Sequence, residues 1–128
     1  MNLDEIMEKP YWIIDILPKQ VPGNSPGQYF KIEKYWLENQ RAEIRQKQFN
    51  LILKLNCYID ISIDDEINPS PEEIRNTMKD ADVSIRIGNA MILSEKDDTY
   101  MTVYNPDKPL LEMIRKIASG EGLFVWKP

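Results

Sequence analysis

An alternation of apolar and mostly polar side chains between residues 49 and 64 is the feature that most constrains the fold of this chain. All odd positions, from Phe49 to Ile63, are apolar or cysteine, whereas the even positions include Asn50, Lys54 and Asp60. Successive side chains of a β-strand point to opposite faces of the sheet. We therefore expect one long strand over 49–64, with its odd side chains in the core and its even side chains in solvent, and a bulge or bend along its length.

Cys57 has an odd position in this predicted strand, so we expect its thiol to lie in the core, where apolar surroundings make it inert. The even positions place Lys54, Tyr58 and Asp60 together on the solvent-facing side.

Further strands and helices follow from local signals elsewhere in the chain. Asn2, Ser70 and Asp107 each precede a helical pattern as an N-cap, and Ser70 is followed by Glu73 as in a capping box. A bulge at Gly88-Asn89 is favoured slightly over a two-residue turn. Helices are predicted over 3–7, 29–47, 71–79 and 108–119, and further strands over 11–17, 83–87, 90–93, 99–104 and 123–126.

This order of elements predicts one α+β domain over residues 1–128. Helices are expected to cover one face of a mainly antiparallel sheet, which gives a two-layer sandwich. A variant of the ferredoxin-like arrangement is the first topology to consider, because βαβ units flank a central hairpin. That arrangement carries many unrelated functions, so it predicts architecture alone.

The chain has no histidine and one cysteine, which removes several classes of chemistry. Serine and cysteine nucleophiles activated by histidine are excluded within the chain, as are zinc sites that need imidazole or four thiolates. We expect no metal and no cofactor. Any acid–base chemistry would need a carboxylate, lysine, tyrosine or thiol with a shifted pKa.

The solvent-facing side of the predicted sheet is the first candidate binding surface. If Ile85, Ile87, Met101 and Val103 face the core, the residues between them share the outer face. Tyrosine and arginine are enriched in protein interfaces, and exposed aromatic residues on a sheet also stack single-stranded RNA bases. The predicted protein-binding surface comprises Lys54, Tyr58, Asp60, Arg86, Tyr100, Thr102 and Tyr104. A solvated face whose tyrosines simply favour β-structure is the alternative.

A run of acidic residues forms the second candidate surface. It contains Asp64, Asp65, Glu66, Glu72 and Glu73, whereas residues 31–54 hold six basic and three acidic residues. This uneven distribution of charge would attract a basic partner or pair two copies of the chain. The run lacks the glycine and terminal glutamate of an EF-hand, so it predicts no calcium site. A solvated loop followed by helix-start acids explains the same run.

Asp15 and Glu33 are the weak catalytic candidates, because each lies among apolar or aromatic residues. A carboxyl group in such surroundings has a raised pKa and is suited to proton transfer. Each residue also has an explanation without a catalytic role. Asp15 then shares the solvent-facing side with Tyr11, and Glu33 lies at the margin of an aromatic stripe.

The predicted function is a non-enzymatic, cytoplasmic binding or regulatory module that acts through protein contacts. A homodimer or an acidic inhibitor of the immunity type fits the net charge of −5. The alternatives are a small hydrolase or isomerase that uses Asp15, Glu33 or Asp60, and a module that binds single-stranded RNA. The acidity counts against nucleic acid, and the sequence has neither an apolar run long enough to span a membrane nor a signal peptide.

Overall fold

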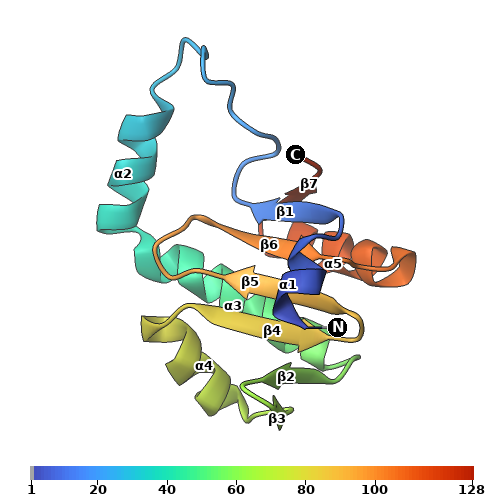
Figure 1. Ribbon diagram of the computed structural model, residues 1–128. Helices are drawn as coiled ribbons and strands as arrows, with labels where there is room; N and C mark the ends of the chain where they lie inside the picture. The colour runs from blue at the N-terminus through green and yellow to red at the C-terminus, as the bar shows by residue number, and fades with distance from the viewer. Residues whose placement is uncertain (1) are drawn as a thin grey trace.

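A seven-stranded antiparallel sheet lies at the centre of the molecule, which the computed structural model describes over residues 2–128. From one edge to the other the strand order is β3-β2-β4-β5-β6-β1-β7, and every neighbouring pair is antiparallel (Figure 1). The strands are β1 (Tyr11–Asp15), β2 (Ile61–Ile63), β3 (Glu66–Ile67), β4 (Val83–Ile87), β5 (Ala90–Ser94), β6 (Tyr100–Tyr104) and β7 (Phe124–Trp126).

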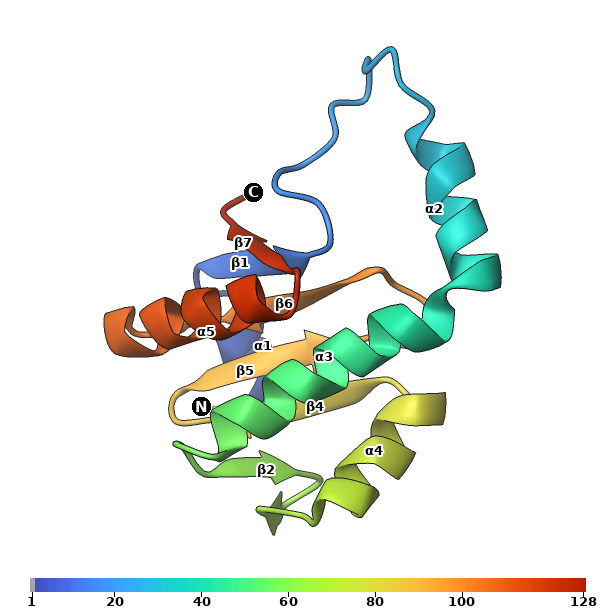
Figure 2. The same cartoon turned by 180° about the vertical axis from the view of Figure 1, so that it is seen from behind.

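Three helices cover one face of this sheet: α3 (Arg41–Asn56), α4 (Pro71–Asp80) and α5 (Lys108–Gly120) (Figure 2). A short helix, α1 (Leu3–Met7), lies on the opposite face, and α2 (Tyr29–Asn39) stands away from the sheet (Figure 1). The predicted α+β sandwich is confirmed, with α1 and α2 as the helices that do not share the common face. Among the described residues, no helix combines the length and apolar character needed to cross a bilayer.

The connections interleave strands that are distant in sequence. Strands β6 and β7, which α5 connects, lie on either side of β1, and both are antiparallel to it. Similarly, β1 and β5 lie on either side of β6. The first of these arrangements is a split βαβ unit, whereas the segment between β1 and β5 contains three helices and three strands, and β4, β2 and β3 widen the sheet at that edge.

The core lies between the sheet and the helices that cover it. In β4 the buried residues Val83, Ile85 and Ile87 alternate with half-buried Ser84 and Arg86, as expected for a strand covered more fully on one face. They belong to a cluster that also contains apolar side chains of α3, α4 and α5. Each fully buried side chain of this size contributes about 1.5–3 kcal/mol through the hydrophobic effect.

The prediction of one strand over 49–64 is wrong. Residues up to Asn56 belong to α3, and only Ile61–Ile63 forms a strand. The buried positions of the helix recur every three or four residues, and Arg45 and Gln48 complete this stripe with long polar side chains. Most residues of the segment, including leucine, lysine, glutamine and arginine, have high helix propensity.

The helix reverses two of the predicted orientations. Ile52, an even position, is buried, whereas Cys57, an odd position, is exposed. An α-helix places side chains at 100° intervals, so position parity has no structural meaning in this segment.

Two other boundaries differ from the prediction. The expected helix over 29–47 is divided at Gln40, whose backbone angles (φ −130°, ψ 18°) separate α2 from α3. Gly88 and Asn89 form a two-residue turn between β4 and β5 rather than a bulge. Gly88 has a φ of +57°, the conformation that a type II′ turn requires at its first central position.

The predicted helix starts are confirmed. The side chains of Asn2, Ser70 and Asp107 accept hydrogen bonds from backbone N–H groups of the first turn, and Ser70 and Glu73 form the reciprocal capping box. These caps depend on neighbouring residues alone, which is why the sequence predicts them.

Candidate functional site

The face of the sheet opposite α3, α4 and α5 carries four of the residues predicted for a binding surface. Strand pairing places Thr102 between Ile13 and Leu93, with Tyr100 and Tyr104 two positions away on either side. Because side chains at alternate positions share a face, these residues lie together with Arg86 of β4. The predicted common orientation of Arg86, Tyr100, Thr102 and Tyr104 is correct, but their predicted exposure to solvent is not, because Thr102 is 8% exposed and the other three are half-buried.

Lys54, Tyr58 and Asp60 lie elsewhere, which corrects their predicted position on this face. Lys54 belongs to α3, on the opposite side of the sheet, and its Nζ lies 2.5 Å from Oε1 of Glu121. Tyr58 is 73% exposed in the turn after α3. Asp60 accepts a hydrogen bond from Nδ2 of Asn68 at 2.9 Å. The helical conformation of 41–56 removes Lys54 from the sheet face, whereas Tyr58 and Asp60 lie in the connection between α3 and β2.

A cavity of about 540 Å³ opens on this face, between the sheet, the loop after β1 and the start of α2. Residues from distant parts of the chain line it, among them Asp15 of β1, Tyr29 of α2, Tyr100 and Thr102 of β6, and Trp126 of β7. Lys19 is the one basic residue among the described lining residues. A volume in this range is typical of sites that bind a small molecule or a few side chains of a partner.

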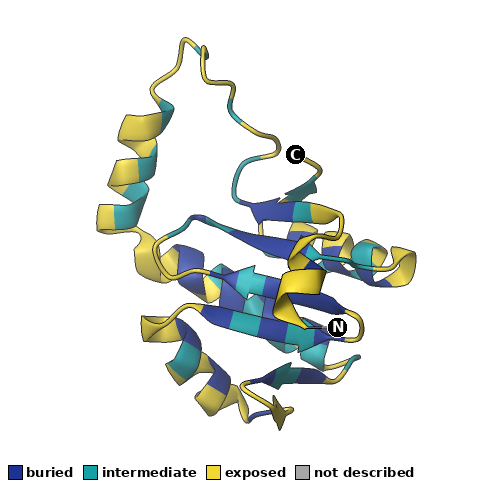
Figure 3. Cartoon of the chain, viewed as in Figure 1, coloured by how far each residue is buried: buried dark blue, intermediate teal, exposed yellow. Residues whose placement is uncertain are grey.

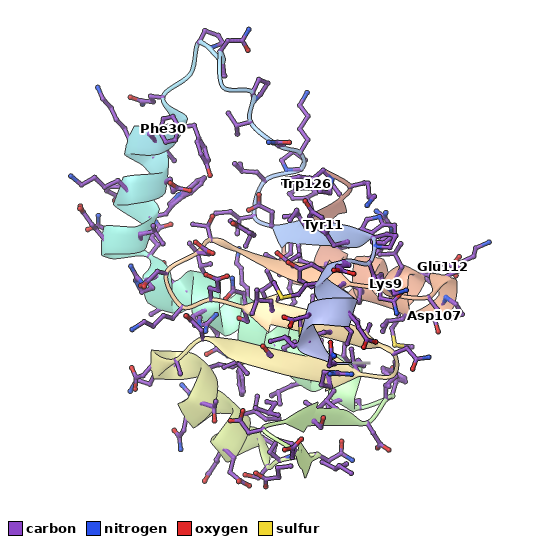
Figure 4. All side chains as sticks on the ribbon, in the orientation of Figure 1. Lys9, Tyr11, Phe30, Asp107, Glu112 and Trp126 are labelled. Carbon is purple, nitrogen blue, oxygen red and sulfur yellow. The ribbon has the colours of Figure 1, made fainter. Side chains whose placement is uncertain are left out.

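Aromatic rings form one end of the cavity. The ring centroids of Tyr11 and Tyr104 lie 5.5 Å apart, and the indole N–H of Trp126 donates a hydrogen bond to the Leu17 carbonyl at 3.2 Å. Figure 4 shows Tyr11 and Trp126 near each other at this end of the sheet and Phe30 on α2. The ammonium group of Lys127, which is not among the lining residues, lies 5.3 Å from the centroid of the Tyr11 ring and 4.6 Å from that of the Trp12 ring.

Asp15 is the most unusual group in the cavity because it is a buried carboxyl with no basic partner among residues 2–128. It is 8% exposed, and it accepts the backbone N–H of Ile16 at 2.7 Å. Burial raises its pKa to about 6, and the negative charge of Glu33 adds to the increase, while hydrogen bonds from Ile16 and Leu17 oppose it.

Glu33 reaches the same region from α2. The hydroxyl group of Tyr29 donates a hydrogen bond to Oε2 of Glu33 at 2.6 Å, and burial together with this bond raises the pKa of Tyr29. The charge of Glu33 acts on both Asp15 and Asp98, so Glu33 lies close enough to affect the pKa of Asp15, but it is not among the residues that line the cavity. Asp60, the third candidate, is not among the residues of this cavity.

Negative charge gathers around these groups. Burial raises the pKa of Asp98, and the charges of Glu95 and Glu33 raise it further. Burial also raises the pKa of Tyr100, with the charge of Asp98 as the next cause. The surroundings of the cavity therefore favour a positively charged group over a negatively charged one.

The helix α2 forms a second side of the site. None of its eleven residues is buried, although four of them are aromatic. Phe30 is 77% exposed and Tyr35 is 56% exposed, and the half-buried positions lie on the side of α2 that faces the sheet (Figure 3). The helix therefore offers aromatic surface that its own chain does not cover.

The acidic residues of the second predicted surface lie at the other edge of the sheet. Asp64 and Asp65 form the turn between β2 and β3, Glu66 begins β3, and Glu72 and Glu73 belong to the first turn of α4. Glu73 has a structural role, because its carboxylate accepts the Ser70 backbone N–H at 3.1 Å. Among residues 2–128, no group of three or more carboxylate or cysteine side chains is arranged to hold a metal ion.

The cavity includes residues that the sequence does not connect with the sheet face. Trp126 reaches it because β7 pairs with β1, and Tyr29 reaches it because the loop after β1 returns α2 toward the sheet. Neither the pairing of β7 with β1 nor the direction of this loop can be predicted from a local pattern in the sequence. Tyr11 and Leu93, in contrast, follow from alternation along their strands.

Comparisons with protein-family models, with curated proteins and with solved structures find no match for this chain.

Proposed function

We propose that this chain is a non-enzymatic binding module that holds a segment of a partner protein between α2 and the open face of the sheet. The partner segment presents a lysine or arginine side chain to the carboxyl groups of the cavity and apolar side chains to the aromatic residues of α2. Regulation or inhibition of a basic protein is the biological role that agrees with a net charge of −5.

One observation carries this proposal: α2 is an ordered helix without a buried side chain. Isolated helices shorter than about 12 residues are marginal in water, and most helices in proteins are stabilised by packing an apolar face. Because α2 packs so little against its own chain and exposes Phe30 and Tyr35, contact with another molecule is the stabilisation that it lacks.

The chemistry of the cavity supports a cationic group in the partner. Tyr11, Tyr100 and Tyr104 supply aromatic faces, and Asp15 supplies a carboxyl group that lacks a basic neighbour. Aromatic faces and carboxylates together favour ammonium and guanidinium groups. Aromatic residues are also the residue types that contribute most energy to protein interfaces.

Site-specific photo-crosslinking tests the proposal in cells that naturally produce the chain. A crosslinking amino acid at Phe30 or Tyr35 is expected to capture one discrete protein, whereas the same amino acid at Tyr58 is not. Tyr58 is the matched control because it is also an exposed aromatic residue but lies outside the cavity and α2.

The captured protein is then purified and titrated against variants of the chain. Phe30→Ala and Tyr100→Ala are each expected to weaken binding about tenfold or more, and Tyr58→Ala less than about twofold. Equal effects of all three substitutions, or no specific crosslink at Phe30 and Tyr35, would show that this surface is not the binding site.

A carboxylate-dependent hydrolase or isomerase is the second candidate, favoured by the position of Asp15 in the cavity and by the effect of the Glu33 charge on its pKa. A carboxyl group with a pKa of about 6 is suited to general acid–base catalysis. A panel of ester, phosphate and glycoside substrates provides the test. Turnover that Asp15→Asn and Glu33→Gln abolish, but Asp60→Asn leaves intact, would support the enzyme; turnover equal in all variants would come from a contaminant.

A further inference from the structure

A groove between α3 and α4 concentrates positive charge on a chain that is acidic overall. It has a volume of about 430 Å³ and lies on the helical side of the sheet, away from the cavity described above. Its basic lining residues are Arg41, Arg45, Arg75, Lys79 and Lys96, and Asp80 is the one acidic residue among the described lining residues. This local reversal of charge favours an acidic occupant.

Three of these cations have no partner within residues 2–128. Arg41 pairs with Asp97, and Arg45 is buried against backbone carbonyls. The side chains of Arg75, Lys79 and Lys96 form no ion pair or hydrogen bond with another described residue. They are therefore available to an anionic group from outside the chain.

The same chain carries a surface of complementary charge. The turn between β2 and β3 presents Asp64, Asp65 and Glu66 in succession, followed by Ile67, which is 70% exposed. None of these acids forms an ion pair with a described cation. We call residues 64–67 the acidic tip.

The helix α4 connects the two surfaces. Three residues separate the acidic tip from its N-terminus, where Glu72 adds a further negative charge, and the groove borders its middle and its C-terminal end through Arg75 and Lys79. The ten residues of α4 span about 15 Å. If two α4 helices lie antiparallel, the acidic end of each meets the basic end of the other, and the two identical contacts close around a two-fold axis.

We propose that two copies of the chain associate through antiparallel α4 helices, with the acidic tip of each copy in the α3–α4 groove of the other. Ile67 supplies the apolar contact of the tip, and Phe49 and Met78 lie beneath the groove. This pairing is independent of the proposed function, because it uses neither α2 nor the open face of the sheet.

Analytical ultracentrifugation of charge-reversed variants tests the pairing. The groove variant is Arg75→Glu with Lys79→Glu, and the tip variant is Glu66→Lys with Glu72→Lys. Asp64 and Asp65 are left unchanged because their positive φ angles disfavour lysine, and Glu73 is left because it closes the capping box. Lys108→Glu with Lys116→Glu on α5 is the control, which changes the net charge by the same amount as the groove variant.

The unmodified chain is expected to form a dimer with a Kd on the order of 10 µM at low salt, and the Kd is expected to rise about tenfold at high salt. The groove variant and the tip variant should each be monomeric, and an equal mixture of them should form dimers because opposite charges then meet at both contacts. The α5 control should dimerise like the unmodified chain.

A monomeric unmodified chain at low salt would overturn the pairing, as would a dimer that survives both charge reversals or a mixture of folded variants that stays monomeric. Circular dichroism establishes that each variant is folded. Where a double variant does not fold, the single exposed substitutions Lys79→Glu and Glu66→Lys are mixed instead and judged by the same outcomes.

Discussion

Asp15 of β1 and Tyr100 of β6 are directly paired across the two antiparallel strands. Directly opposite residues project from the same face of a sheet, so the buried carboxyl group has a phenol beside it and no cation. The pKa of about 6 follows from this position, because burial disfavours the charged form and Glu33 adds a nearby negative charge.

Asp15→Asn is expected to stabilise the fold at neutral pH. The pKa of Asp15 in the folded protein lies above its ordinary value of 3.8, so the folded protein binds this proton more tightly than the unfolded chain does. The resulting stabilisation is complete below pH 4 and is lost as the pH rises through 6. Allowing for partial solvation, the free energy of unfolding should increase by about 1–2 kcal/mol at pH 8 and change little at pH 4.

Urea denaturation at the two pH values measures this difference. Glu112→Gln, on the exposed side of α5, is the control and should have a small effect at both pH values. An Asp15→Asn variant that is destabilised at pH 8 would indicate that the ionised carboxylate is the stabilising form.

Ile52→Ala and Leu53→Ala distinguish the helix observed over 41–56 from an extended strand. Ile52 is 1% exposed in α3, whereas Leu53 is half-buried. Loss of the Ile52 side chain should lower the free energy of unfolding by about 2–4 kcal/mol, and loss of the Leu53 side chain by about half as much or less. A strand with odd positions inward would give the reverse order of the two effects in chemical denaturation.

Arg45 is expected to stabilise the fold through uncharged acceptors. Its guanidinium group donates to the backbone carbonyls of Met78 and Ala81 at 2.7 and 3.0 Å and to Oε1 of Gln48 at 2.7 Å. Arg45→Ala leaves these buried acceptors unpaired at the end of α4 and should cost about 3 kcal/mol. Arg115→Ala, which removes one exposed bond to the Val125 carbonyl, should cost less than about 1 kcal/mol in the same thermal or urea titration.

Gly88 and Gly120 should respond to alanine in opposite directions. Gly88 has a φ of +57° in the β4–β5 turn, so Gly88→Ala is expected to lower the free energy of unfolding by about 1 kcal/mol. Gly120 lies in the last turn of α5 with open space at its Cβ position, and Gly120→Ala should raise stability by up to about 1 kcal/mol. Melting temperatures that shift in the same direction would refute this assignment of the turn.

Local signals in the sequence predict much of the fold. The caps at Ser70 and Asp107, and the alternation in β4, each involve residues close together in the chain and appear in the structure as expected, whereas Thr102 of β6 is buried like its two neighbours. The region 49–56 misleads because every odd position is apolar and Ile52 is the one apolar even position, while Arg45 and Gln48 contribute polar side chains to the buried stripe of the helix. A pattern based on apolar residues alone does not detect that stripe.

The candidate site is predicted in part. Parity along β6 places Tyr100, Thr102 and Tyr104 on one face, and the apolar surroundings of Asp15 single it out. The approach of Glu33 to Asp15 depends on the direction that α2 takes after a proline-containing loop. A periodic pattern in the sequence does not predict that direction. Non-local relationships of this kind need the three-dimensional structure.

Hydrogen–deuterium exchange of the purified chain tests most directly whether α2 lacks a partner. The backbone amides of Tyr29–Asn39 should exchange far faster than those of Arg41–Asn56, because α3 is packed in the core and α2 has no buried residue. Protection of α2 equal to that of α3 in the monomeric chain would show that the chain itself stabilises this helix, which would contradict the proposed binding surface.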